Sequence, residues 1–304
     1  KLFSPKPTIK FNTNTPPKPP VQQGKNVANG VIFDYYLPHD WTDSSELILE
    51  IKDVFQNTIR TYSNQKPKKQ KMWAGGPPPQ QILPSKAGLN RFNWDLRRET
   101  LPAVDGVFVM GDYRGHLVNP GDYLFKMMSE KDTAVTMIKV LPDLRLQVNP
   151  QEHGNQQILL MRIETAFKDI HQSVNQLRSI KSQLNGRLGL LREMEERKEL
   201  VRIGEEALAA ITKWEEKLIQ PKQKTFQDVI NYNNKLNAQL IHLKGYIDAA
   251  EPKPTAGSKE RWNDLQKDWS VYEKERSAII EEEMNAYNVM FKALDLPAII
   301  MSEE

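Results

Sequence analysis

The chain of 304 residues contains no cysteine. This absence excludes disulfide bridges, thiolate metal sites and cysteine nucleophiles, although it does not settle the compartment. Long apolar runs are also missing: no stretch of about 18 apolar residues occurs, so no membrane span is predicted. The formal net charge is only +3, which is too small to indicate a nucleic-acid partner.

What is present suffices for folded cores. The chain is 39% hydrophobic and 27% charged, which is typical of globular rather than disordered proteins. Its length predicts two domains. The sequence opens at Lys1 with neither an initiator Met nor a signal-type apolar stretch, and we therefore expect a mature or trimmed piece of a longer protein.

Residues 1–28 are rich in Pro, Lys, Asn and Thr. The run from Thr15 to Pro20 favours an extended polyproline-type path without internal hydrogen bonds. We predict that residues 1–28 form a Pro-rich linker.

Residues 29–148 have the alternation and turn residues of short strands. Six strands are predicted, at 31–37, 46–51, 57–62, 89–96, 121–127 and 134–140. Short strands at this spacing, separated by Pro and Gly, favour an antiparallel β-sandwich of about 120 residues.

Exposed aromatic side chains are the candidate binding residues of this sandwich. The long loop 66–83 carries Trp73, and an exposed Trp is a common anchor for a protein partner or a sugar face. The alternative is that Trp73 folds back onto its own domain. Trp41, Tyr35 and Tyr36 are the further candidates for binding.

From about residue 150 the apolar period becomes helical. The first of four apolar stripes is a heptad seam, in which the side chains recur at steps of 4, 3, 4, 3 and 7: Ile163, Phe167, Ile170, Val174, Leu177 and Leu184. Helix ends are predicted near Asn185–Gly186, at Gln220–Pro221 and at Glu251–Pro254, with Thr255 or Ser258 capping the last helix. Residues 149–304 are therefore predicted to form an up-down four-helix bundle.

No pattern in the sequence identifies catalytic residues, a metal site or a cofactor. The five histidines show no metal-ligand spacing. His171 and His242 are interpreted as residues of the bundle surface or edge. Phosphate-binding loops and nucleophile elbows are absent.

Two motifs resemble a known family. The strand Gly88–Arg97 resembles the G-x-N-x-F-x-W-D-L-R strand of secreted bacterial proteins with BNR-type (sortilin-like) β-propellers. The segment Asn119–Tyr123 resembles the P-G-x-Y opening of a strand in the immunoglobulin-like domain that follows the propeller. The helical segment is similar to the C-terminal extension of these proteins, for example at Phe226–Asp228 and Tyr287–Asn288. The resemblance extends from about residue 28 to the C-terminus.

This resemblance implies an immunoglobulin-like β-sandwich, then helices, in the C-terminal region of an exported bacterial protein. Such proteins are often labelled glycosyl hydrolases, but any such activity would lie in the propeller, so no catalytic residue carries over to this chain. The expected partner is the N-terminal propeller or a surface protein. The inserted loop Lys66–Pro79 departs from the family pattern.

Two other functions stay open. The first is an independent carbohydrate- or protein-binding module that uses the exposed aromatic residues. The second is a hydrolase whose active site lies within this chain, which the residue spacing does not support.

Overall fold

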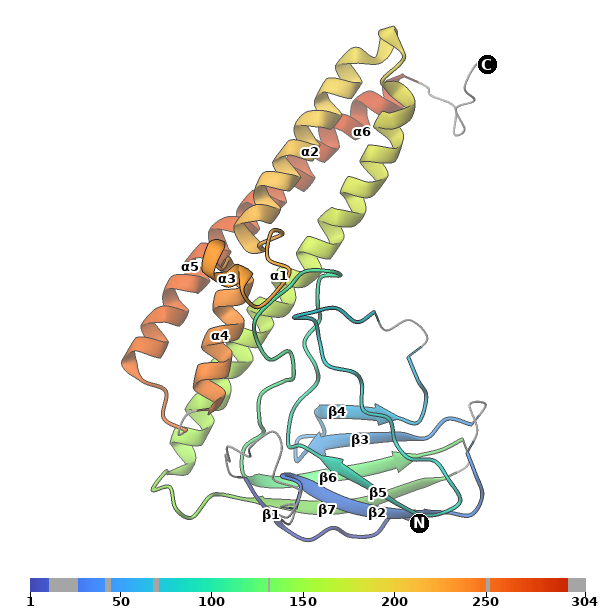
Figure 1. Ribbon diagram of the computed structural model, residues 1–304, viewed down its shortest axis with the longest axis vertical. Helices are drawn as coiled ribbons and strands as arrows, with labels where there is room; N and C mark the ends of the chain where they lie inside the picture. The colour runs from blue at the N-terminus through green and yellow to red at the C-terminus, as the bar shows by residue number, and fades with distance from the viewer. Residues whose placement is uncertain (11–26, 42–44, 68–70, 131, 250–251, 295–304) are drawn as a thin grey trace.

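The computed structural model describes residues 1–10, 27–41, 45–67, 71–130, 132–249 and 252–294. The fold is mixed: strands form a β-part at one end, and helices form an elongated rod that rises from it (Figure 1). The predicted polyproline run at residues 15–20 and the segment 295–304 lie outside the described residues.

Two sheets make up the β-part. The strands are β1 (Thr8–Ile9), β2 (Val31–Leu37), β3 (Ile48–Asp53), β4 (Thr58–Ser63), β5 (Gly88–Trp94), β6 (Gly121–Met128) and β7 (Thr133–Leu141). One sheet has the order β1-β7-β6-β3-β4, and the other pairs β2 with β5. All six predicted strands are confirmed, with bounds that differ by at most two residues.

The inward faces of both sheets meet in one core. Side chains alternate along β2, so that Val31, Phe33, Tyr35 and Leu37 are buried while the intervening residues are more exposed. The Phe33 ring from β2 packs edge-on against Phe125 from β6, with centroids 5.0 Å apart. Burying one such ring contributes about 2–3 kcal/mol, and these contacts hold the two sheets together.

Residues 1–10 belong to the β-part. The Phe3 amide donates to the carbonyl of Asp34 in β2 at 3.0 Å. A few residues later, β1 pairs in parallel with the end of β7. The segment therefore crosses from one sheet to the other, which the linker prediction for residues 1–28 did not include.

The rod consists of five longer helices and three short helical elements within the described residues. They are α1 (Pro150–Leu191), η1 (Glu195–Arg197), α2 (Lys198–Leu218), α3 (Asp228–Asn231), α4 (Leu236–Ala249), α5 (Ala256–Ala278), η2 (Ile279–Glu283) and α6 (Met284–Ala293). Asn149 caps α1 in a capping box with Glu152. Thr255 caps α5, because its side chain accepts from the Ser258 amide at 3.1 Å. All six residues of the predicted first seam are buried.

Three helix predictions need correction. Helix α1 runs through Asn185–Gly186, where an end was predicted. The spacing of another apolar stripe predicts one further helix, but the structure divides this stripe between the short α3 and α4. Its residues are Val229, Tyr232, Leu236, Leu240, Leu243 and Ile247. Helices α2 and α4 lie one above the other beside α1 (Figure 1). Elements α5, η2 and α6 follow one another without a break and form a single long helical segment. A cross-section therefore meets three helices, not the four of the predicted up-down bundle.

Candidate functional site

The predicted binding residue Tyr35 is not available to a ligand. Its side chain is completely buried, and its hydroxyl donates to the Pro84 carbonyl. Burial raises the pKa of this hydroxyl. Tyr35 is therefore a core residue, and its neighbour Tyr36, at 47% exposure, faces outward.

Trp73 anchors its loop to the neighbouring loop. Its indole nitrogen donates to the Val107 carbonyl at 2.8 Å, and the ring is half-buried. The Val109 amide donates to the Gly75 carbonyl at 3.1 Å, so a second hydrogen bond holds the same two loops together. These contacts agree with the alternative in which Trp73 folds back onto its own predicted domain, residues 29–148.

Trp41 lines a pocket of about 260 Å³. The pocket lies between the β2–β3 connection, the β6–β7 turn and the first residues of the chain. Besides Trp41, its lining includes Lys1, Leu2, Tyr36, Leu37, Pro38, His39, Ser45, Leu47, Met127, Met128, Ser129, Glu130, Asp132 and Ala134. The structure thus places two of the four aromatic candidates, Trp41 and Tyr36, in one pocket.

The Trp41 ring is held in place. It stacks on His39, with centroids 5.8 Å apart and planes inclined by 8°. Its backbone amide donates to the Ser85 carbonyl at 2.8 Å, and its carbonyl accepts from the Ser85 hydroxyl at 3.1 Å. The indole Nε1 is buried and has no hydrogen-bond partner among the described residues. Such an unpaired buried donor is uncommon in proteins.

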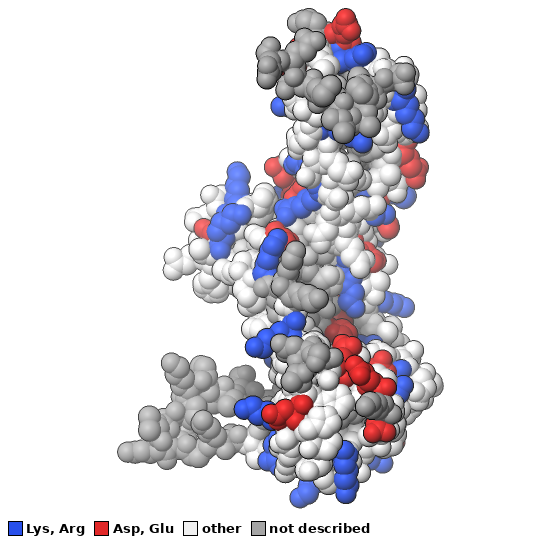
Figure 2. All heavy atoms as spheres, turned by 90° about the vertical axis from the view of Figure 1, so that its right-hand side faces the viewer, with Lys and Arg blue, Asp and Glu red and all other residues white. Residues whose placement is uncertain are grey.

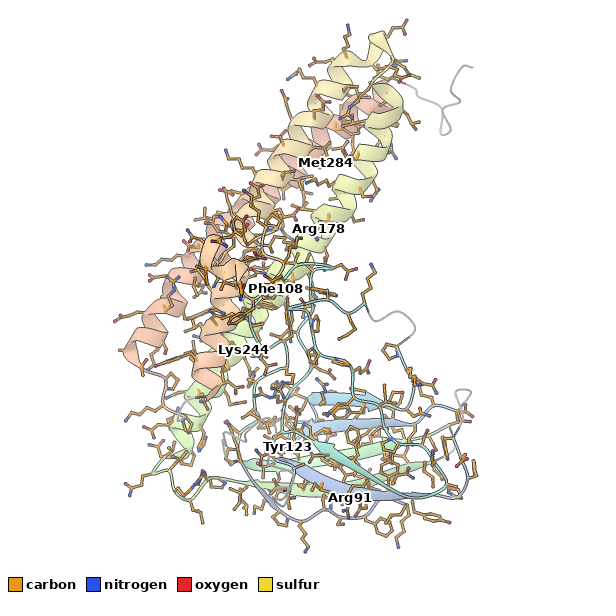
Figure 3. The ribbon with its side chains drawn as sticks, viewed as in Figure 1. Arg91, Phe108, Tyr123, Arg178, Lys244 and Met284 are labelled. Carbon is orange, nitrogen blue, oxygen red and sulfur yellow. The ribbon has the colours of Figure 1, made fainter. Side chains whose placement is uncertain are left out.

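At the other end of the β-part, the connection between β5 and β6 docks onto the helices. Residues 95–120 leave the sheets and insert five apolar side chains into the main core of the rod: Leu101, Val104, Val107, Val109 and Tyr113. Figure 3 shows Phe108 of this connection and Lys244 of α4 in this region. At Gly111 the approach is so close that a Cβ atom would lie 2.5 Å from Cγ2 of Ile241. We call this contact the joint.

A buried acid and imidazole lie within the joint. Glu164 of α1 accepts the His116 backbone amide at 2.7 Å through Oε1, and its Oε2 lies 3.0 Å from Nδ1 of His116. On the other side of the ring, Nε2 of His116 lies 3.1 Å from Oε1 of Gln157. The exposed fractions of His116 and Glu164 are 0% and 4%. Both groups are therefore enclosed by protein.

Two residues of α4 complete the joint. Asp248 accepts from the Leu117 amide at 3.0 Å and from the Arg97 guanidinium at 2.8 Å. Lys244 donates to the carbonyls of Asp112 and Arg114. These bonds tie the β5–β6 connection to α4 through two residues that lie one helical turn apart.

The electrostatics of the joint follow from burial and pairing. Burial opposes ionisation of Glu164, but hydrogen bonds and charge from His116 and Lys244 outweigh it and hold the pKa of this carboxyl below its usual range. Burial lowers the pKa of Lys244, and the charges of Glu164, Asp112 and Asp248 partly offset this. A His–Glu pair can act in proton transfer. Here Glu164 binds the backbone amide of His116 and the imidazole faces Gln157, both inside the protein, which is the arrangement of a structural contact.

His171 belongs to the same contact, which corrects its predicted surface position. Its exposed fraction is 0%. Nδ1 donates to the Pro102 carbonyl at 3.0 Å, and Nε2 accepts from the Asn237 amide at 3.2 Å. Burial lowers the pKa of His171 to about 4, so the ring is neutral at pH 7. His242, in contrast, is exposed as predicted.

Within the described residues, no three His, Asp or Glu side chains come together as possible ligands of a metal ion. No helix in that part of the chain is long and apolar enough to cross a membrane. The surface view shows Lys and Arg interspersed with Asp and Glu along the rod, without a field of one sign (Figure 2).

Comparison with known proteins gave no match: no family model, no curated protein and no solved structure resembles this chain significantly.

Proposed function

We propose that this chain is a non-catalytic structural and interaction module, the C-terminal part of an exported bacterial β-propeller protein. The observation that carries the proposal is the joint. Its buried carboxylates, Glu164 and Asp248, accept hydrogen bonds from backbone amides of the β5–β6 connection. They do not face a solvent-filled cleft. Separating the β-part from the rod would leave these groups without partners, at a cost of several kcal/mol. The two parts therefore act as one rigid body that can brace a propeller or extend its binding surface.

The fold class that we propose for the β-part is an immunoglobulin-like sandwich. Three features support it. Residues 1–10 cross between the sheets, β1 runs parallel to the last strand, and the Tyr123 hydroxyl donates to the Asn119 carbonyl at 2.7 Å. The last contact is typical of the tyrosine corner of such domains. Tyr123 belongs to the P-G-x-Y segment that carries the family resemblance, and Figure 3 labels it at the start of β6.

The proposal is tested on the native gene product. We expect the coding sequence upstream of Lys1 to contain an export signal and a BNR-type propeller. We further expect the separately produced propeller to bind this chain in isothermal titration calorimetry, because the module is proposed to brace it. A gene without a propeller would refute the proposal, as would turnover of model glycosides by this chain alone.

A second candidate function is an independent carbohydrate- or protein-binding module. The pocket around Trp41 favours it, because an anchored aromatic ring lies there beside polar groups.

A further inference from the structure

The pocket around Trp41 lies at the free end of the β-part. Strand pairing places Ile48, Met128 and Thr133 at one end of the larger sheet. The joint and the start of α1 follow the opposite strand ends, at Trp94 and Leu141 (Figure 1). The helices therefore leave the pocket uncovered, and this position does not depend on the proposed function.

The chemistry of the pocket is mixed. Its apolar wall includes Leu47, just before β3, and Met127 of β6. The Trp41 ring, which stacks on His39, adds an aromatic side chain to this wall. Polar groups of opposite sign lie at its rim: the carboxylates of Glu130 and Asp132, together with the Lys1 amine. An aromatic surface suits the C–H face of a ring, and the rim suits hydroxyl groups.

We propose that this pocket binds a neutral sugar residue of a glycan. A sugar ring matches both surfaces, since it has apolar C–H faces and a belt of hydroxyl groups. The volume of about 260 Å³ lies just below the range of about 300–1,000 Å³ for drug-sized ligands, which fits one ring rather than a long oligosaccharide. Because both charge signs line the rim, neither a cation nor an anion is matched as well.

The test is saturation-transfer NMR on the full chain with the methyl β-glycosides of glucose, galactose and N-acetylglucosamine. We expect transfer to at least one of them. Trp41→Ala should weaken that binding about tenfold or more, which corresponds to about 1.4 kcal/mol. Trp41→Phe, which keeps a smaller aromatic ring at this position, should weaken it less.

Trp73→Ala is the matched control, because Trp73 is also half-buried but lies outside the pocket. It should bind the sugar like the wild type. Should Trp41→Ala fail to fold, Glu130→Gln provides the second test, since this exposed carboxylate can be changed without disturbing the core; it should also weaken binding.

Three results would overturn the proposal. The first is no transfer to any of the three glycosides. The second is unchanged binding by a folded Trp41→Ala variant, or by Glu130→Gln if Trp41→Ala does not fold. The third is saturable binding of tetramethylammonium chloride in place of the sugars, which would identify a cation site instead.

Discussion

Replacing Glu164 by alanine tests the joint directly. The substitution leaves the His116 amide, which Glu164 accepts at 2.7 Å, buried without a partner. It also removes the carboxylate that lies 3.0 Å from the imidazole. An unsatisfied buried donor costs about 1–3 kcal/mol, and breaking a buried ionic pair costs about 3–5 kcal/mol in all. We expect Glu164→Ala to destabilise the protein by about 3–5 kcal/mol.

Urea unfolding at pH 7, followed by tryptophan fluorescence and by circular dichroism, measures this loss. Four of the six tryptophans, Trp94, Trp214, Trp262 and Trp269, are buried, so fluorescence reports on both parts. Glu199→Ala is the control. Glu199 pairs with Arg202 on the exposed surface of α2, where such pairs contribute little. We expect almost no change in its unfolding midpoint.

The pH dependence has a definite sign. Since the folded-state pKa of Glu164 lies below its usual value, the unfolded chain binds the proton more readily. The stabilisation by Glu164 is therefore complete above about pH 4.5 and is lost as the pH falls through the folded-state pKa. The difference between wild type and Glu164→Ala should narrow on acidification. A midpoint equal to that of the wild type, or a difference that does not change with pH, would refute the reasoning.

Three further predictions concern helices α1 and α2 and the N-terminal segment. Gly186→Ala should raise the free energy of unfolding by about 0.5–1 kcal/mol, because a Cβ there meets no atom within 4 Å. Gly204→Ala should lower the free energy of unfolding, since its Cβ would lie 2.7 Å from a Leu188 methyl. The midpoints of urea unfolding test both predictions. Burial lowers the pKa of Lys10 to about 8, with Asp248 opposing and Arg97 adding to the shift. Wild-type stability should therefore gain a rising contribution from about pH 8 to 10.5, where the unfolded chain holds the extra proton, and thermal melts of Lys10→Met should lack it.

The strands could be predicted because their local pattern agrees with their tertiary burial. The alternation along β2 also shows why the prediction of Tyr35 as a binding residue was wrong. Tyr35 has the same phase as Val31 and Phe33, which are buried, whereas Tyr36 has the opposite phase. Strand periodicity thus assigns Tyr35 to the core, and the aromatic composition of the segment alone could not separate the two tyrosines.

The end predicted at Asn185–Gly186 failed because tertiary packing outweighs local propensity. The apolar seam of α1 continues through Leu184, Leu188 and Leu191, all of which are buried. These residues form a second cluster with Leu200 of α2 and Tyr287 of α6. A glycine inside a helix costs about 1 kcal/mol, whereas burying each leucine contributes about 1.5–3 kcal/mol, so the helix continues.

The joint could not be predicted, because its members come from distant positions. His116 and Glu164 are 48 residues apart, and no spacing rule links a loop to a helix face. A weak signal exists on the helices: Glu164 follows Ile163, and Asp248 follows Ile247, at the edges of apolar stripes. A carboxylate at such an edge indicates a polar partner from another element but does not say which one.

The positions of the joint and the pocket together explain how the module could present a ligand site. If the β-part were flexibly tethered to the rod, it would lose orientational freedom whenever a partner bound both parts, and this cost would reduce the affinity. Here the β5–β6 connection is held by α1 through Glu164 and by α4 through Lys244 and Asp248. The pocket around Trp41 therefore keeps a fixed direction relative to the rod. If the pocket binds a sugar as proposed, disrupting the joint should leave that affinity unchanged, while it should weaken binding to any partner that must contact the pocket and the rod at once.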